Sequence, residues 1–225
     1  MKKNITKTIK DFENETGIGF CTNHRGKMTD LYSLSTSPLC NENCMKRSKI
    51  KGSICEKCFS MNMQEYMTGL REKLAINTEL LTTVKLTKQQ IPYINAPLCM
   101  VRFEAFGNLK NTLQVYNYFL IAKCNKHCDF ALWTKNPWII EQAMKEFNLS
   151  KPGNLVIIGS SYMINKPMKE FFQKYDFIDF IFTVYDKKYI KTNNVTVNCG
   201  GRSCKDCQKC YRGTHDSYEI NEQLK

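Results

Sequence analysis

The cysteines are the residues of this sequence whose type and spacing most directly predict chemistry. The 225 residues contain 12 of them, and eight fall into two short groups. Thiolate sulfur binds zinc and iron–sulfur clusters. In a reducing cytosol, grouped cysteines therefore predict metal centres rather than disulfides. The first group is Cys40, Cys44, Cys55 and Cys58, and the second group is Cys199, Cys204, Cys207 and Cys210.

The second group predicts an iron–sulfur cluster more strongly than a zinc site. Its cysteines follow one another with four, two and two residues between them, without the long loop that separates the two pairs of a zinc ribbon. Gly200 and Gly201 allow the backbone to turn closely around a cluster and to offer N–H groups to its sulfurs. Zinc and unligated, redox-active thiols remain open as alternatives.

The first group has the spacing of a zinc ribbon, because ten residues separate its two close pairs. Its place in the chain instead favours a catalytic site over a structural zinc site. It lies between a predicted strand at 31–36 and a predicted helix at 59–81, at the mouth of the expected barrel. The stretch between the two pairs is basic and predicts a solvated insertion rather than a phosphate clamp. Its basic residues are Lys46, Arg47, Lys49 and Lys51.

A looser pair, Cys124 and Cys128, encloses His127, while Cys21 and Cys99 stand alone. Two cysteines spaced in this way are more often partly buried thiols at a helix end than ligands of a third metal. We therefore expect the first and second groups, and not this pair, to form the metal centres.

No motif for a catalytic nucleophile, a phosphate loop or a dinucleotide appears in the sequence. His24 and His215 have no evident partner. The N-terminal residues lack the apolar region of a signal peptide, and no apolar run approaches the ~20 residues of a membrane helix. We expect a cytoplasmic protein, of a bacterium or an infected host cell, without a membrane partner.

The formal net charge of +12 predicts an anionic partner, such as a nucleic acid or another anionic substrate. Only 6 of the 33 basic residues are arginine, which disfavours sequence-specific reading of DNA. A lysine-rich composition also follows from an AT-rich coding genome, so this alternative stays open beside nucleic-acid binding.

Strands and helices alternate along the central part of the chain. Such alternation predicts βα units with a parallel sheet, arranged as an open or closed (β/α) barrel or as a doubly wound sheet. The expected fold class is α/β, with a partial (β/α) barrel of about five or six parallel strands. Strands are predicted at 31–36, 100–106, 130–134, 155–158 and 177–184, with helices that start at 59, at Asn111 or Thr112, at Asn136 and near Pro167.

Three segments follow from this pattern: an N-terminal lead-in at 1–30, a barrel domain at 31–190 with its cysteine loop at 40–58, and a small cysteine-rich metal-binding segment at 191–225. Polar residues gather where the predicted strands end, and in parallel α/β folds this edge holds the active site. We therefore expect a shared pocket there, lined by Ser35, Thr36, Glu104, Gly107, Asn108, Thr134, Lys135, Gly159, Ser160, Ser161, Tyr185 and Asp186.

The cysteine loop after the first strand, followed by αβ repeats, resembles the radical S-adenosylmethionine superfamily. More narrowly, the chain is similar to the phage "gene product eighty-eight" family and related phage or mobile-element proteins. The resemblance covers roughly Leu34 to Tyr211. It is carried by the segments LSTSPLC, CEKCF, RFEAFGNL, WTKNP, VIIGSS and CGGRSCKDCQKCY.

This resemblance implies an enzyme in which three cysteines of the first group hold a [4Fe–4S] cluster and the fourth iron binds S-adenosylmethionine. It also implies that Glu104 and Asn108 hold the amino group and ribose of that cofactor, and that Ser160 contacts it from another strand. The second cysteine group would then hold an auxiliary cluster.

The first group departs from the superfamily pattern, which has three cysteines with three and two residues between them. Here ten residues separate Cys44 from Cys55, and the aromatic Phe59 follows the last cysteine. Four bound cysteines would leave no iron free for the cofactor. The alternative function is therefore a non-enzymatic protein, stabilised by zinc or iron–sulfur, that contacts nucleic acid or a host protein.

Overall fold

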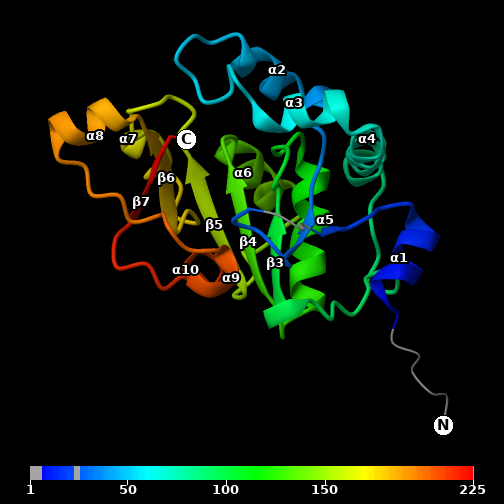
Figure 1. The fold of residues 1–225 in the computed structure, drawn as a ribbon. Helices are drawn as coiled ribbons and strands as arrows, with labels where there is room; N and C mark the ends of the chain where they lie inside the picture. The colour runs from blue at the N-terminus through cyan, green and yellow to red at the C-terminus, as the bar shows by residue number, and fades with distance from the viewer. Residues whose placement is uncertain (1–6, 23–25, 225) are drawn as a thin grey trace.

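A seven-stranded sheet organises residues 7–22 and 26–224, which are the residues that the computed structural model describes (Figure 1). The order of the strands in the sheet is their order in the sequence. The first strand is antiparallel to the second, and all other neighbours are parallel. The strands are β1 (Cys21–Thr22), β2 (Tyr32–Leu34), β3 (Met100–Phe103), β4 (Asp129–Thr134), β5 (Leu155–Ser160), β6 (Phe180–Tyr185) and β7 (Glu219–Gln223).

The sequential strand order decides between the two architectures that the sequence allowed. A doubly wound sheet reverses its order at a switch point, whereas crossovers of one hand between consecutive strands place the connecting helices on one face. The order β1 to β7 has no reversal, so the doubly wound alternative is wrong. The parallel α/β prediction is confirmed, with β2 to β7 as parallel strands, and the sheet does not close into a barrel.

The helices agree with the sequence where capping signals were strong. Asn111 caps the helix that starts at Thr112, because its side chain accepts a hydrogen bond from the backbone of Gln114. The helix predicted at 59–81 is two helices, since Met67 leaves the helical conformation. In the described ranges, no helix is long and apolar enough to span a membrane. The helices are α1 (Ile9–Thr16), α2 (Glu42–Ser48), α3 (Phe59–Tyr66), α4 (Thr68–Thr83), α5 (Thr112–Cys124), α6 (Pro137–Glu146), α7 (Lys169–Phe172), α8 (Lys187–Asn193), α9 (Cys204–Cys207) and α10 (Lys209–Arg212).

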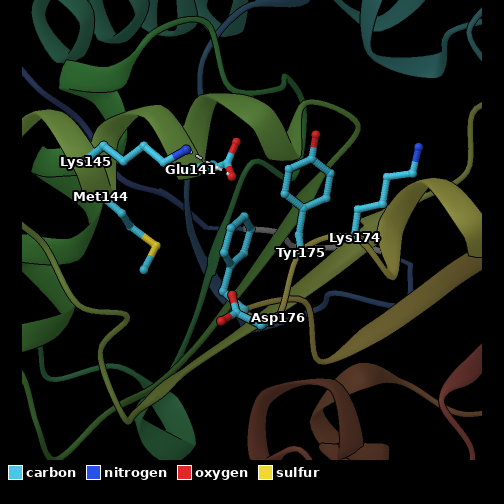
Figure 2. Close-up of a pocket in the computed structure, with 7 residues that line it drawn as sticks. Glu141, Met144, Lys145, Lys174, Tyr175 and Asp176 are labelled. Atoms are coloured by element: carbon cyan, nitrogen blue, oxygen red, sulfur yellow. Dashed lines mark ion pairs between the residues drawn. The ribbon is translucent and has the colours of Figure 1, made fainter.

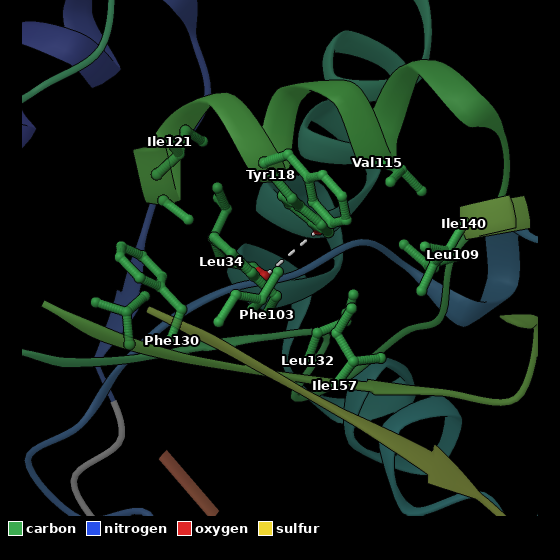
Figure 3. Packing of buried hydrophobic residues seen from close by; sticks show 14 of the residues in the cluster. Leu34, Phe103, Leu109, Val115, Tyr118, Ile121, Phe130, Leu132, Ile140 and Ile157 are labelled. Atoms are coloured by element: carbon green, nitrogen blue, oxygen red, sulfur yellow. Dashed lines mark hydrogen bonds between the residues drawn. The ribbon is translucent and has the colours of Figure 1, made fainter. Parts of the chain in front are cut away.

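The main core lies between the sheet and α4, α5 and α6 (Figure 3). Phe103 of β3 stacks on Tyr118 of α5, with 4.3 Å between ring centres, and on Phe130 of β4, at 5.1 Å. All three rings are buried. Burial of one such side chain stabilises the fold by about 1.5–3 kcal/mol. This core fixes the sheet against the helices, so that the strands form a rigid support for the cysteine-rich segments.

The other face of the sheet is covered by the cysteine-rich C-terminal segment. Tyr211 of α10 is buried against Leu31, Met100 and Ala131. The segment also supplies β7, which pairs with β6. Strand β7 is not predictable from its residues. Ile220 is the single apolar residue of Glu219–Gln223, so the strand has no alternating apolar pattern. Residues 191–224 therefore contribute a strand to the sheet and buried side chains to one of its faces.

Glycine at position 159 is required by packing, since a Cβ there would lie 2.4 Å from the ring of Phe172. We predict that Gly159→Ala lowers the free energy of unfolding by about 1–3 kcal/mol through overpacking. Gly153→Ala is the matched control, because a Cβ at Gly153 meets nothing within 4 Å. Urea unfolding of both variants measures the effect, and equal midpoints would contradict this packing.

Candidate metal centres

The four thiols of the second cysteine group line a single cavity of about 150 Å³ on the sheet face. Two helices of four residues carry three of these cysteines. They meet at Gln208, whose φ of 57° reverses the chain between α9 and α10. Gly201, with a φ of 73°, provides the turn after Cys199, as its position in the sequence suggested. The local spacing and these two turns therefore bring all four cysteines to one site.

Cationic side chains surround this cavity. The ammonium group of Lys27 lies 3.7 Å from Cys199 Sγ and also pairs with Glu222. Burial raises the pKa of Cys210, and the Arg102 guanidinium opposes this rise. A metal cluster with thiolate ligands is anionic, so these cations favour the bound form.

His215 also belongs to this site, although no partner for it is evident in the sequence. Its Nε2 lies 3.2 Å from Cys210 Sγ, and burial lowers its pKa. His215 lies five residues after Cys210 in the sequence. This spacing indicates a contact only when helix α10 and the turn after it are known. His24, the other unpartnered histidine, lies outside the described residues.

The spread of these thiols bears on the kind of metal. Within the described part of the chain, no three of the four have sulfurs that all lie within 4.8 Å of one another. A zinc ion with Zn–S bonds of about 2.3 Å needs sulfurs about 3.8 Å apart. A multi-iron cluster keeps its thiolates at the corners of a larger body, so the donor set fits a cluster with less rearrangement than a single zinc ion.

The first cysteine group lies over the carboxyl ends of the strands, where α2 and α3 sit above the sheet (Figure 1). The Asn41 amide donates to the backbone oxygens of Asn108, at 2.9 Å, and Leu109, at 3.2 Å. At its other end the loop pairs with the segment after β5 through Ile54 N and Tyr162 O, 2.8 Å apart. The loop therefore crosses the sheet from β2 to β5 and is fixed along the way.

Arg47 is the central attachment of this loop, and the prediction of a solvated insertion is wrong for it. The side chain is 9% exposed, whereas the neighbouring Lys46 side chain is 77% exposed. Arg47 Nη2 donates to Asn136 Oδ1 at 2.6 Å, which also explains why Asn136 does not cap α6. Its Nη1 atom is buried without a hydrogen-bond partner, so one donor of the guanidinium stays available beside Cys44 and Cys55.

The thiols of the first group are less closely gathered than those of the second. Burial raises the pKa of Cys44 to about 12, and Lys135, Cys55 and Glu104 are among its charged neighbours. Cys40 is exposed. The structure thus brings Cys44 near Cys55 at the carboxyl edge, while a four-cysteine centre at this loop remains a prediction.

Glu104, a predicted cofactor ligand, is buried at the end of β3 and is 2% exposed. Its carboxylate accepts hydrogen bonds from Thr36 Oγ1 at 3.0 Å, Gln114 Nε2 at 2.5 Å and Tyr118 OH at 2.6 Å. Burial raises the pKa of Glu104 to about 7, against the opposing effect of these bonds. The carboxylate therefore ties β3 to α5, and its role toward a cofactor stays a prediction.

Asn108 and Ser160 also lie at the carboxyl edge, as the sequence predicted for strand ends. Asn108 Oδ1 accepts from Thr134 Oγ1 at 3.0 Å and from Lys135 N at 3.2 Å, which joins the ends of β3 and β4. Its Nδ2 is buried without a partner. Ser160 ends β5 and is 6% exposed. Many of the polar strand ends thus hold the cysteine loop and one another, and Asn108 keeps one unused donor.

The two cysteine groups lie at different places on the sheet. The first covers the carboxyl ends of the strands, whereas α9 and α10 lie beside the amino ends (Figure 1). An ion pair of Arg212 with Asp129, the first residue of β4, fixes α10 there.

A further cavity, of about 240 Å³, opens between α6 and the turn that precedes β6 (Figure 2). An ion pair between Glu141 and Lys145, at 3.2 Å, lies at its wall. No cysteine or histidine lines it. The metal-ligating side chains therefore lie elsewhere on the molecule.

Comparison with protein-family models, curated proteins and solved structures gives no match to this chain. Its class rests on its own fold and site: an α/β protein with an open, sequentially ordered and mostly parallel sheet, with one cysteine-rich segment above the carboxyl ends of the strands and another on a face of the sheet.

Proposed function

We propose that this chain is an iron–sulfur protein in which Cys199, Cys204, Cys207 and Cys210 hold a [4Fe–4S] cluster. The observation that carries the proposal is the convergence of these four thiols on one cavity. Such a cluster supplies one-electron transfer at a potential set by its charge, hydrogen bonds and burial.

The chain's own residues fit that role. Trp133 and Tyr211 pack beside Cys210 and exclude water from one side of the cavity. Lys27 and Arg102 add positive charge beside the proposed cluster. This charge favours the reduced cluster, which is more negative, and so raises its reduction potential.

We place the protein in the radical S-adenosylmethionine class, with a partial (β/α) barrel and a second cluster on three of the first-group cysteines. The cysteine loop above the carboxyl ends of parallel strands supports this assignment. The unused Nδ2 of Asn108 would serve as a donor to S-adenosylmethionine, and Ser160 would contact it from β5. The substrate is anionic, a nucleotide or nucleic acid, in keeping with the net charge of +12.

A non-enzymatic protein is the second candidate, and the surroundings of Glu104 favour it. Both carboxylate oxygens already accept hydrogen bonds within the protein. A cofactor could engage them only at the expense of those bonds. In this alternative, zinc or iron–sulfur centres stabilise a basic surface that binds nucleic acid or a host protein, with an affinity that falls steeply with salt.

Metal analysis of anaerobically purified protein tests the proposal. We expect a brown protein with about four iron and four sulfide per cluster. Stoichiometric zinc without iron would contradict it. After reduction, the same sample is mixed with S-adenosylmethionine, and 5′-deoxyadenosine is measured. A cluster-containing protein that neither binds nor cleaves S-adenosylmethionine would reject the enzymatic half and select the second candidate.

A further inference from the structure

Cys99, His127 and Cys128 meet at the amino ends of β3 and β4, and we propose that they bind a zinc ion. One ligand atom from each residue lies within 4.8 Å of the other two. Within residues 7–22 and 26–224, no other three cysteine, histidine or acidic side chains converge so closely. The site is separate from both cysteine groups and does not depend on the function proposed above.

The register of the sheet creates this site. Met100 lies opposite Asp129 in the parallel pair of β3 and β4, so the residues just before them, Cys99 and Cys128, are also neighbours. The Cys128 thiol lies close enough to Cys99 for that neighbour to raise its pKa, and its Sγ donates to Ile94 O at 3.4 Å. In the sequence Cys99 stands alone, and Cys128 was paired with Cys124 instead. Cys124 is exposed at the end of α5 and is not a member of the group.

The backbone that carries Cys99 is held in an unfavourable conformation. Leu98 and Cys99 have φ values of 55° and 51°, in the left-handed region. This conformation is unfavourable for L-residues, because the side chain crowds the following carbonyl oxygen. Two such residues in succession, directly before β3, turn the chain sharply at the position of the thiol. Strain of this kind is retained where the surrounding structure fixes it, and it concentrates at ligand sites.

A hydrogen bond and a stacked ring hold the His127 ring in place. Its Nε2 lies 2.9 Å from the backbone oxygen of Ile94, to which it donates a hydrogen bond. That bond leaves Nδ1 without a proton and with its lone pair free for a metal. A backbone carbonyl that holds the second ring nitrogen is the usual arrangement behind a metal-bound histidine. Tyr93 stacks on the ring at 4.3 Å and fixes its plane.

Two asparagines hold the arms of the site in place. The Asn125 side chain, which is fully buried, accepts from Ile94 N at 2.8 Å and donates to Pro92 O at 3.0 Å. Asn154 Nδ2 donates to Cys128 O at 2.9 Å. These amides are positioning residues: they fix the carbonyl behind His127 and the turn that carries Cys128, so the ligands are placed before any metal arrives.

The donor set selects zinc. Two thiolates and an imidazole suit this borderline-soft ion, and a tetrahedral site with Zn–S bonds of about 2.3 Å puts the sulfurs about 3.8 Å apart. The ligand atoms lie within 4.8 Å, so the sulfurs need to close by at most about 1 Å. Three protein ligands leave a fourth position for water, and the exposed His127 gives solvent access to it.

The test is the zinc content of matched variants of the full chain. Cys99→Ser and His127→Ala should each lose about one zinc per chain relative to the native protein. Cys124→Ser is the control and should keep it. Iron and sulfide should be equal in all four proteins, so this result stands apart from failure of the cluster proposal. Cobalt added to zinc-stripped protein should give thiolate-to-cobalt charge-transfer bands that the two variants lack.

Equal zinc contents in the native protein and both variants would overturn the proposal. So would a Cys99–Cys128 disulfide, seen as a native mass lighter by two hydrogens in unreduced peptides from anaerobically prepared protein. His127 is exposed, so His127→Ala is expected to fold and decides the matter if Cys99→Ser does not. Far-UV circular dichroism of each variant checks this.

Discussion

Serine in place of both Cys204 and Cys207 is expected to remove the iron and sulfide of the C-terminal segment. It should also lower the free energy of unfolding by more than about 4 kcal/mol, the range seen when a structural metal is lost. The reason is the size of the elements involved. The helices α9 and α10 have four residues each. Helices of this length are unstable alone, so in the proposed protein the cluster adds to the packing of Tyr211 in holding them.

The loss should spread from this segment to the sheet, because Tyr211 is buried and β7 pairs with β6. Iron and sulfide analysis, together with urea unfolding under anaerobic conditions, measures both effects. Cys124→Ser is the control, since this thiol is exposed and lies outside all three cysteine sites. Full iron content in the double variant would show that the cluster is held elsewhere. Loss of iron with unchanged stability would show that the cluster has no structural role.

Glu104→Gln is expected to remove a pH dependence of stability that the native protein shows between about pH 4.5 and 7. The folded-state pKa of about 7 lies above the ordinary value of 4.5 because the group is buried. Below both values the carboxyl is protonated in both states and costs nothing. As the pH rises through this window the unfolded chain ionises first, so folding loses stability. The full difference corresponds to about 3 kcal/mol and is present above pH 7.

Glutamine can take the place of the protonated carboxyl with the loss of one long hydrogen bond, which Thr36 N donates to Glu104 Oε2 at 3.4 Å. Its oxygen can accept from Gln114 and Tyr118, and its nitrogen can donate to Thr36 Oγ1, which lies 3.1 Å from Glu104 Oε2. The Thr36 hydroxyl then donates onward to Asn108 O, at 3.4 Å. Native protein and Glu104→Gln should therefore be equally stable near pH 4.5, with the variant about 3 kcal/mol more stable at pH 8.

The charged groups around Glu104 do not disturb this comparison. Tyr118, from α5, has a pKa well above its ordinary value and stays neutral throughout. Cys44, from α2, is a further neighbour of Glu104 and is the same in both proteins. Urea unfolding from pH 4.5 to 8 gives the two curves. Glu72→Gln on the exposed face of α4 is the control and should follow the native protein. Parallel curves for native protein and Glu104→Gln would show that burial does not shift this carboxyl.

Several elements could be predicted because their signals are local. The Asn111 cap and the apolar runs of β4, β5 and β6 depend on residues close in sequence, and the structure confirms them. Helix α2 within the cysteine loop was not predicted, and neither was β7. In both segments polar residues predominate, so the helix or strand forms through tertiary contacts rather than through its own pattern.

The contrast between Arg47 and its neighbours shows the same limit in a functional segment. The basic stretch between Cys44 and Cys55 predicts a solvated segment, and the Lys46 side chain is exposed as expected. Arg47 is buried because Asn136 and the rings of Trp138 and Tyr162 surround it, and these residues come from the segments that follow β4 and β5. Nothing near Arg47 in the sequence indicates those partners.

By itself the sequence determined the C-terminal cysteine site and the parallel α/β class. Four cysteines with four, two and two residues between them cannot lie far apart in any fold, so their convergence is a local property. Tertiary structure alone decided that His215 joins Cys210 and that Cys99 meets Cys128. It also put the first cysteine group above the carboxyl ends of the strands and the second on a face of the sheet. The physical reason is that strand register and the face covered by each segment are set by long-range packing, which short-range spacing does not encode.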